Sequence, residues 1–174
     1  MKRILYISSL FVTLVFSEVK IGWIDSNEIM NKYEPVRQVQ IDLEKEGRRL
    51  ELEVTKLAQQ RDSLFSEYQR QQSLMSVDRR TQKEEEITNL EMQIQRYQME
   101  KFGPEGELAR KQVQLMQPIT IKIQEAIDVI SVERGFDYVL DAAGGALVYT
   151  LPQNNLTEDV IEQLNKLNSG NNGE

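Results

Sequence analysis

The chain has 174 residues, of which 21 are basic and 28 acidic, and it contains no histidine and no cysteine. Without histidine it lacks the most frequent general base and metal ligand, and without cysteine it can form no disulfide. A net charge of −7 also suits nucleic acid poorly, because affinity for the duplex comes largely from neutralised phosphates. Composition therefore argues against an enzyme and against a nucleic-acid partner, and no metal or cofactor site is predicted.

The N-terminus is typical of a cleavable export signal. Lys2 and Arg3 precede 13 uncharged residues, Ile4–Phe16, and Ser17 offers an acceptable cleavage position. A membrane-spanning helix needs about 20 apolar residues, so this segment is short for an anchor. We expect residues 1–17 to be a signal peptide and the mature chain to lack a stable membrane span. An uncleaved anchor is the alternative.

Residues 19–25 predict a strand, because apolar side chains alternate there at period two. After it, a seven-residue apolar repeat indicates a coiled coil. The polar stretch between its two halves predicts a helical hairpin over residues 32–116, with a turn near residues 73–76. The outgoing ladder is Val36, Leu43, Leu50, Leu57 and Leu64, and the returning ladder is Ile87, Ile94, Leu108 and Leu115, with Lys101 interrupting it.

Both limbs of this predicted arm contain weak helical points. A coiled-coil helix faces its partner with two positions of each heptad; the ladder fills one, and the other holds Gly47 together with polar residues. The return limb contains Gly103, Pro104 and Gly106. Proline costs about 3 kcal/mol inside a helix and glycine about 1 kcal/mol. Folding the hairpin places Pro104 opposite residue 45, so we predict a hinge formed by these four residues. A simple helix break without a mechanical role is the alternative.

Beyond the hinge, apolar residues at three- and four-residue steps predict a helix that faces a core, with Pro118 near its start. Residues 136–141 and 145–150 predict a β-hairpin around two glycines. A last helix is expected to begin with Thr157 as its cap, and residues 169–174 are expected to be a disordered tail.

The predicted sheet is too small to be stable alone. We therefore predict an α+β protein whose body consists of residues 18–31 and 117–168. This body is expected to assemble with further copies through exposed strand edges and apolar side chains. The candidate oligomerisation residues are Val19, Ile21, Trp23, Val139, Leu140, Leu147 and Val148.

The order and spacing of these parts resemble the Skp/OmpH family of periplasmic chaperones for outer-membrane proteins. The resemblance covers residues 19–167 and is carried by KIGWIDSNEIMNKYE, KFGPEGELARKQVQLMQPI, FDYVLDAAGGALVYT and LTEDVIEQLN. It implies a periplasmic homotrimer with a barrel-like body, whose three arms enclose an unfolded outer-membrane protein. The best-known members are strongly basic, whereas residues 32–117 of this chain hold 15 basic and 16 acidic residues.

The function that follows is an ATP-independent holdase, and the alternative is a structural or scaffolding coiled-coil protein of the cell envelope. Apolar residues off the seam are the candidate client contacts, although packing between the limbs is the alternative for each. These residues are Phe65, Leu74, Met75, Val77, Met92, Met99 and Phe102.

Overall fold

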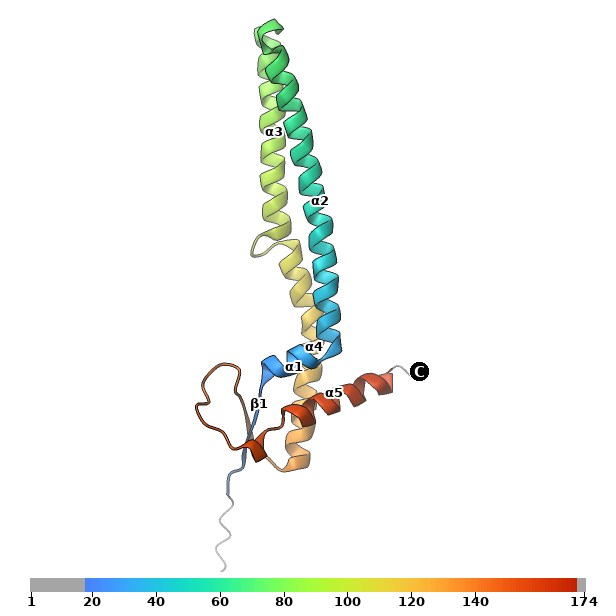
Figure 1. The fold of residues 1–174 in the computed structure, drawn as a ribbon, viewed down its shortest axis with the longest axis vertical. Coiled ribbons are helices and arrows are strands. Elements are labelled where there is room, and N and C mark those ends of the chain that lie inside the picture. Colours follow the sequence, from blue (N-terminus) through green and yellow to red (C-terminus); the bar gives the residue numbers. More distant parts are fainter. Residues whose placement is uncertain (1–17, 172–174) are drawn as a thin grey trace, which may run out of the picture.

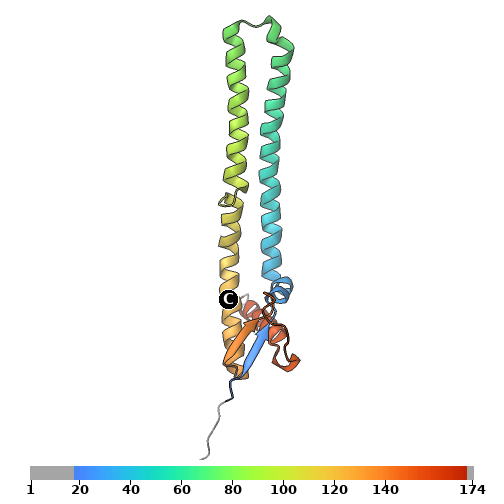
Figure 2. The same cartoon turned by 90° about the vertical axis from the view of Figure 1, so that its left-hand side faces the viewer.

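The computed structural model describes residues 18–171, so the predicted signal peptide and the last three residues lie outside the described part of the chain. A long arm of paired helices stands on a small body that contains a two-stranded sheet (Figures 1 and 2). The predicted helical hairpin on a small β-containing body is therefore confirmed.

The outgoing limb of the arm is one continuous helix, α2 (Glu34–Gln71), with Pro35 in its first turn. The chain reverses at a short 3-10 helix, Gln72–Leu74, and the return limb begins with α3 (Val77–Phe102). Ser76 caps α3 by accepting a hydrogen bond from the Arg79 amide. At about 1.5 Å per residue, α2 extends for about 57 Å.

The ladder residues of both limbs turn toward the facing helix. Val36, Leu50 and Ile87 are buried, and the remaining apolar ladder residues are half-buried. The seam also contains polar contacts, because Arg61 reaches Glu91 at 3.1 Å. The two limbs therefore pair along a mixed seam, which is weaker than a fully apolar one.

The sheet has two parallel strands, β1 (Ile21–Ile24) and β2 (Tyr138–Asp141), with Ile21 opposite Tyr138 and Ile24 opposite Asp141. The predicted β-hairpin is wrong: residues 145–150, although within the described part of the chain, form no strand. The turn itself exists, because Gly145 (φ 70°) donates to the Ala142 carbonyl at 3.2 Å. The chain then leaves as a loop that stands away from the body in Figure 1.

The second edge of β1 is taken by a segment much later in the sequence. Leu156 donates its amide to the Trp23 carbonyl at 2.9 Å, and Asn154 donates its side-chain amide to the Ile21 carbonyl at 3.0 Å. Because β1 is occupied on both sides, residues 145–150 have no free edge of β1 to join. Their partner would have to be β2 or another chain.

The core lies where the sheet, the base of the arm and the last helix meet. Helix α1 (Ser26–Lys32) leads into α2, α4 (Glu107–Arg134) brings the return limb down to β2, and α5 (Thr157–Asn171) crosses the base. Each contributes one apolar face. The buried members of this cluster are Ile24, Ile29, Tyr33, Val36, Val39, Ile119, Ala126, Ile130, Leu156, Val160, Ile161 and Leu164.

Two helix boundaries differ from the sequence expectation. Pro118 lies well inside α4 and not near its start, and it is exposed, so the carbonyl that loses its helical partner can face water. Helix α5 continues to Asn171, and the Ser169 hydroxyl donates to the Asn165 carbonyl at 2.9 Å. Residues 169–171 are therefore helical, where a disordered tail was expected.

Candidate functional surfaces of the arm and body

The return limb is interrupted by a tight turn between α3 and α4. Gly106 donates its amide to the Gly103 carbonyl at 2.8 Å, and Pro104 occupies the second position, which proline favours in such turns. A Cβ at Gly103 would lie 2.4 Å from the Met99 carbonyl oxygen, and one at Gly106 would lie 2.8 Å from the Gly103 carbonyl oxygen. Both glycines are needed because the backbone approaches them too closely for a side chain.

The contacts between the limbs show that this turn is looped out of the helical path. Above the turn, Tyr68 contacts Glu84 and Arg61 contacts Glu91. Moving from the first contact to the second covers the same number of residues on each limb, so the two helices advance together. Arg49 lies twelve residues before Arg61, yet it reaches Glu107, sixteen residues after Glu91. The four additional residues are Gly103–Gly106, which protrude from the limb in Figure 1.

Looping out four residues leaves the seam in phase. A helical turn takes about 3.6 residues, so α4 resumes with its apolar side chains on nearly the same face as α3. Leu108 accordingly lies against Gly47, where a Cβ on the glycine would be 3.9 Å from a Leu108 methyl group. The hairpin therefore places Gly47 just on the base side of the turn, and its predicted partner, Pro104, lies in the protruding loop.

Charged side chains surround the turn. Glu46 accepts two hydrogen bonds from Arg49, at 2.7 and 3.0 Å, and this pairing lowers the pKa of Glu46. Lys101 at the end of α3 pairs with Glu107 at the start of α4, which lowers the pKa of Glu107 and raises that of Lys101. Exposed pairs of this kind contribute about 0–1 kcal/mol, so they orient the turn without locking it.

The residues predicted to contact a client are mostly exposed, and they do not converge on one pocket. At the tip, Leu74 is 87% exposed and Val77 is 68% exposed, whereas Met75 is half-buried. Phe65, Met92, Met99 and Phe102 are exposed along the two limbs. Sequence reasoning missed four comparable exposed side chains, although their spacing from the ladders already places them off the seam: Ile41, Leu52, Val113 and Ile121.

A second apolar surface lies on the outer face of the sheet. Val19, Ile21 and Leu140 are exposed there, Trp23 is half-buried, and Val148 in the adjoining loop is 98% exposed. The Trp23 indole donates to the Leu151 carbonyl at 3.1 Å, which holds the loop beside this face. Tyr138 and Tyr149, which sequence reasoning missed, are also exposed here.

One of the predicted assembly residues points elsewhere. Val139 packs against the core of its own chain, because it alternates with the outward-facing Tyr138 and Leu140 along β2. Leu147 is half-buried and lines a shallow depression together with Trp23 and Leu140. No other strand among residues 18–171 pairs with the outer edge of β2.

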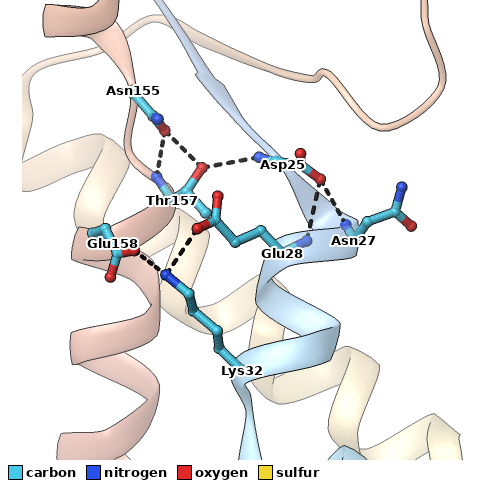
Figure 3. Close-up of polar contacts among 7 residues, drawn as sticks. All are labelled: Asp25, Asn27, Glu28, Lys32, Asn155, Thr157 and Glu158. Atoms are coloured by element: carbon cyan, nitrogen blue, oxygen red, sulfur yellow. Dashed lines mark hydrogen bonds and ion pairs between the residues drawn. The ribbon is translucent and has the colours of Figure 1, made fainter.

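A network of polar contacts fixes the base of the arm to the body (Figure 3). Asp25 accepts hydrogen bonds from the amides of Asn27 and Glu28, at 3.0 and 3.2 Å, and thereby caps α1. Its own amide donates to the hydroxyl of the fully buried Thr157 at 2.9 Å, and this hydroxyl donates to Asn155 at 2.6 Å. Thr157 thus joins two segments and does not act as the predicted helix cap.

The same network continues to the last turn of α1. Lys32 lies between Glu28, at 2.8 Å, and Glu158 on α5, and both carboxylates raise the pKa of Lys32. Next to it, Tyr33 is buried and donates its hydroxyl to Asn168 at 3.1 Å. The junction from α1 to α2 is therefore held by α5.

These features define a class of protein: a coiled-coil arm with exposed apolar side chains, rooted in a small α/β body that leaves an apolar sheet face open. Residues 20–164 match the family described as outer membrane protein (OmpH-like). Because this match covers most of the sequence, the chain belongs to the Skp/OmpH-like family.

Individual relatives agree with this assignment. The chain is similar to the chaperone protein Skp of Photorhabdus luminescens, at 28% identity over 94% of this chain and 99% of the relative. The Skp chaperone of Photorhabdus laumondii is 27% identical over the same shares. An OmpH-like crystal structure from Caulobacter crescentus CB15 has the same fold, with a TM-score of 0.76 at 12% identity and 87% coverage of both chains.

None of the helices within residues 18–171 has an apolar stretch of the length that crossing a bilayer requires. Likewise, no group of three or more potential metal-ligating side chains gathers in this part of the chain.

Proposed function

We propose that this protein is an ATP-independent holdase of the periplasm, which binds unfolded outer-membrane proteins between helical arms and keeps them soluble. The observation that carries the proposal is the row of exposed large apolar side chains along an arm too narrow to bury them. Met92 and Met99 on α3 illustrate it, since both are exposed although each helix already has a partner. Similarity to the Skp chaperones supports the same reading.

Retention of a client would arise from many weak contacts. Methionine side chains are flexible and polarizable, so they adapt to different apolar surfaces. Several such contacts within one enclosure raise the effective concentration of the client near each of them. No nucleotide is needed for such binding, because the apolar surfaces are exposed before the client arrives.

Assembly would place several arms around one client. We infer a homotrimer with a barrel-like body, formed through the outer face of the sheet and the free edge of β2. The exposed Ile21, Leu140 and Val148 support this interface, because large apolar patches on a small body favour association. Residues 145–150, which have the composition of a strand, would then pair with β2 of a neighbouring copy.

A softer region at the turn would let the arms fit clients of different sizes. Gly47, Gly103, Pro104 and Gly106 form this hinge in our proposal. The polar network around Thr157 holds the arm at its root, and the return limb loses its helical hydrogen bonds between α3 and α4, which supports bending there.

The proposal is tested with the mature chain and an unfolded outer-membrane barrel protein diluted out of urea. We expect that a several-fold excess of the mature protein suppresses light scattering by the client without added nucleotide. Bovine serum albumin at equal mass is the control. Aggregation that proceeds as in the control would reject the holdase, and stable complexes with folded partners alone would favour an envelope scaffold.

A further inference from the structure

We propose that the arm holds its client through apolar contacts that do not depend on the sign of the client's charge, so that binding withstands high salt. The inference rests on the proposed holdase function and adds the class of client. This class is an unfolded chain that exposes apolar side chains, whether its net charge is negative or positive.

The first support is a set of exposed apolar side chains on the shaft of the arm, which we call the shaft surface: Leu52, Met92, Met99 and Val113. Each lies away from the facing limb, and Met99 and Val113 are 69% and 67% exposed. Met92 and Met99 are seven residues apart and therefore share one face of α3. Each lies five residues after a seam residue, which turns it to the far side of the helix.

The second support is that the charges of the shaft neutralise one another. Most basic side chains lie beside a carboxylate of the same limb or of the facing limb, and the sequence of the arm is nearly neutral as well. Examples are Lys56 with Glu53 at 2.7 Å, Lys83 with Glu86 at 2.7 Å, Arg61 with Glu91 at 3.1 Å and Lys111 with Glu46 at 3.8 Å.

The tip gathers three unpaired arginines within a short stretch of chain, whereas Lys45, Arg96 and Arg110, which also form no ion pair within residues 18–171, are spaced along the shaft. Within residues 18–171, no carboxylate lies within ion-pair distance of Arg70, Arg79 or Arg80. These three arginines lie within six residues of the exposed Leu74 in the sequence, and they are where the charge of a client would have its largest effect. They provide the natural charge variant for a test, because their substitution leaves the shaft unchanged.

A client close to the shaft experiences little net electrostatic field from the paired charges. Two opposite charges about 3 Å apart nearly cancel at greater distances, and salt screens the remainder within about 8 Å at physiological strength. Apolar burial contributes about 25 cal/mol per Å² of buried surface and is not weakened by sodium chloride. The shaft should therefore bind mainly by apolar contact, and the effect of salt should be largest at the tip.

The experiment measures binding of a fluorescently labelled eight-stranded outer-membrane barrel protein, diluted out of urea, to the full mature chain at about 50 and about 500 mM sodium chloride. The same client with succinylated lysines provides a more negative chain of equal apolar content. The apolar variant is Met92→Ser with Met99→Ser and Val113→Ser, and the matched charge variant is Arg79→Gln with Arg80→Gln. Circular dichroism and mass measurement verify that both keep the fold and the assembly.

We expect Kd to change less than about threefold with salt, with succinylation and in the charge variant, and to rise about tenfold or more in the apolar variant. A loss of more than about tenfold in affinity at high salt, or a weaker charge variant beside an unaltered apolar variant, would overturn the inference and leave the holdase intact. Absence of binding at both salt concentrations would overturn the holdase itself, and the inference with it.

Discussion

At the scale of single residues, Thr157 is the side chain whose role differs most from what its position in the sequence suggests. A threonine at the start of a helix usually caps it. Here Thr157 is fully buried and its hydroxyl accepts a hydrogen bond from the amide of Asp25, the residue that follows β1 more than a hundred residues earlier. No local pattern reveals this contact, because the two partners meet only in the folded chain.

Thr157→Val should therefore destabilise the body. Valine keeps the shape but leaves the Asp25 amide without an acceptor, which costs about 1–3 kcal/mol. Urea unfolding of the mature chain at one fixed protein concentration measures the change. The control is Thr120→Val on the exposed side of α4, where the hydroxyl donates only to the preceding turn, with an expected change within about 0.5 kcal/mol. Equal losses in both variants would contradict the role of Thr157.

The glycines of the arm could be predicted as weak helical points. Which of them must be glycine for steric reasons could not be predicted. Gly103 and Gly106 are fixed by contacts with backbone oxygens, whereas Gly47 has room for a Cβ. Residue types identify where a helix is weak, because helix propensity is a local property. Steric necessity depends on how closely another segment approaches, and that is a property of the fold.

At the scale of elements, the turn between α3 and α4 behaves as an insert in an otherwise regular limb. Deletion of residues 103–106 should join Phe102 to Glu107 as one helix and preserve the seam, because the contacts with α2 already skip these four residues. We expect higher helix content and a stiffer arm. Gly47→Ala should act in the same direction, since alanine favours the helix by about 1 kcal/mol.

Spin labels provide the measurement. The chain has no cysteine, so Val132→Cys in the body and Gln71→Cys near the tip introduce the only labelling sites. Labelled protein is diluted with an excess of unlabelled protein, so that distances within one chain dominate. The distance distribution should narrow in both variants, with an unchanged oligomeric state. An equally broad distribution in the deletion variant would reject the hinge.

The segment 145–150 shows why strand prediction failed in this body. Its composition is that of a strand, and the turn before it forms as expected. A strand also needs backbone partners: residues 154–156 occupy the second side of β1, and the outer edge of β2 stays unpaired within residues 18–171, so residues 145–150 join neither strand. Which segment takes an edge depends on the competition among distant segments, and single-sequence patterns do not report it.

At the scale of the whole molecule, the body and the arm should separate functionally. The body contains the core and the open sheet face, whereas the arm contains the shaft surface and the tip. Glu46 and Lys111 face each other at 3.8 Å, so residues 47–110 can be replaced by a short glycine-rich loop without removing core residues.

This armless variant should keep the oligomeric state of the mature chain and lose the suppression of client aggregation. The reason is that assembly uses the sheet face in our proposal, while the client contacts lie on the arm. Mass measurement in solution and the light-scattering assay report the two properties separately. A monomeric armless variant would contradict assembly through the body, and retained suppression would contradict client binding by the arm.

The sequence by itself determined the arm, its reversal near residues 73–76 and the break in its return limb, because heptad repeats, glycine and proline act on their immediate neighbours. Only the tertiary structure decided the parallel pairing of β1 with β2, the exclusion of residues 145–150 from the sheet, and the buried bridge of Thr157 to Asp25. Each of these joins segments more than a hundred residues apart. Their free energy comes from contacts that exist only after the arm has folded back and brought both ends of the chain together.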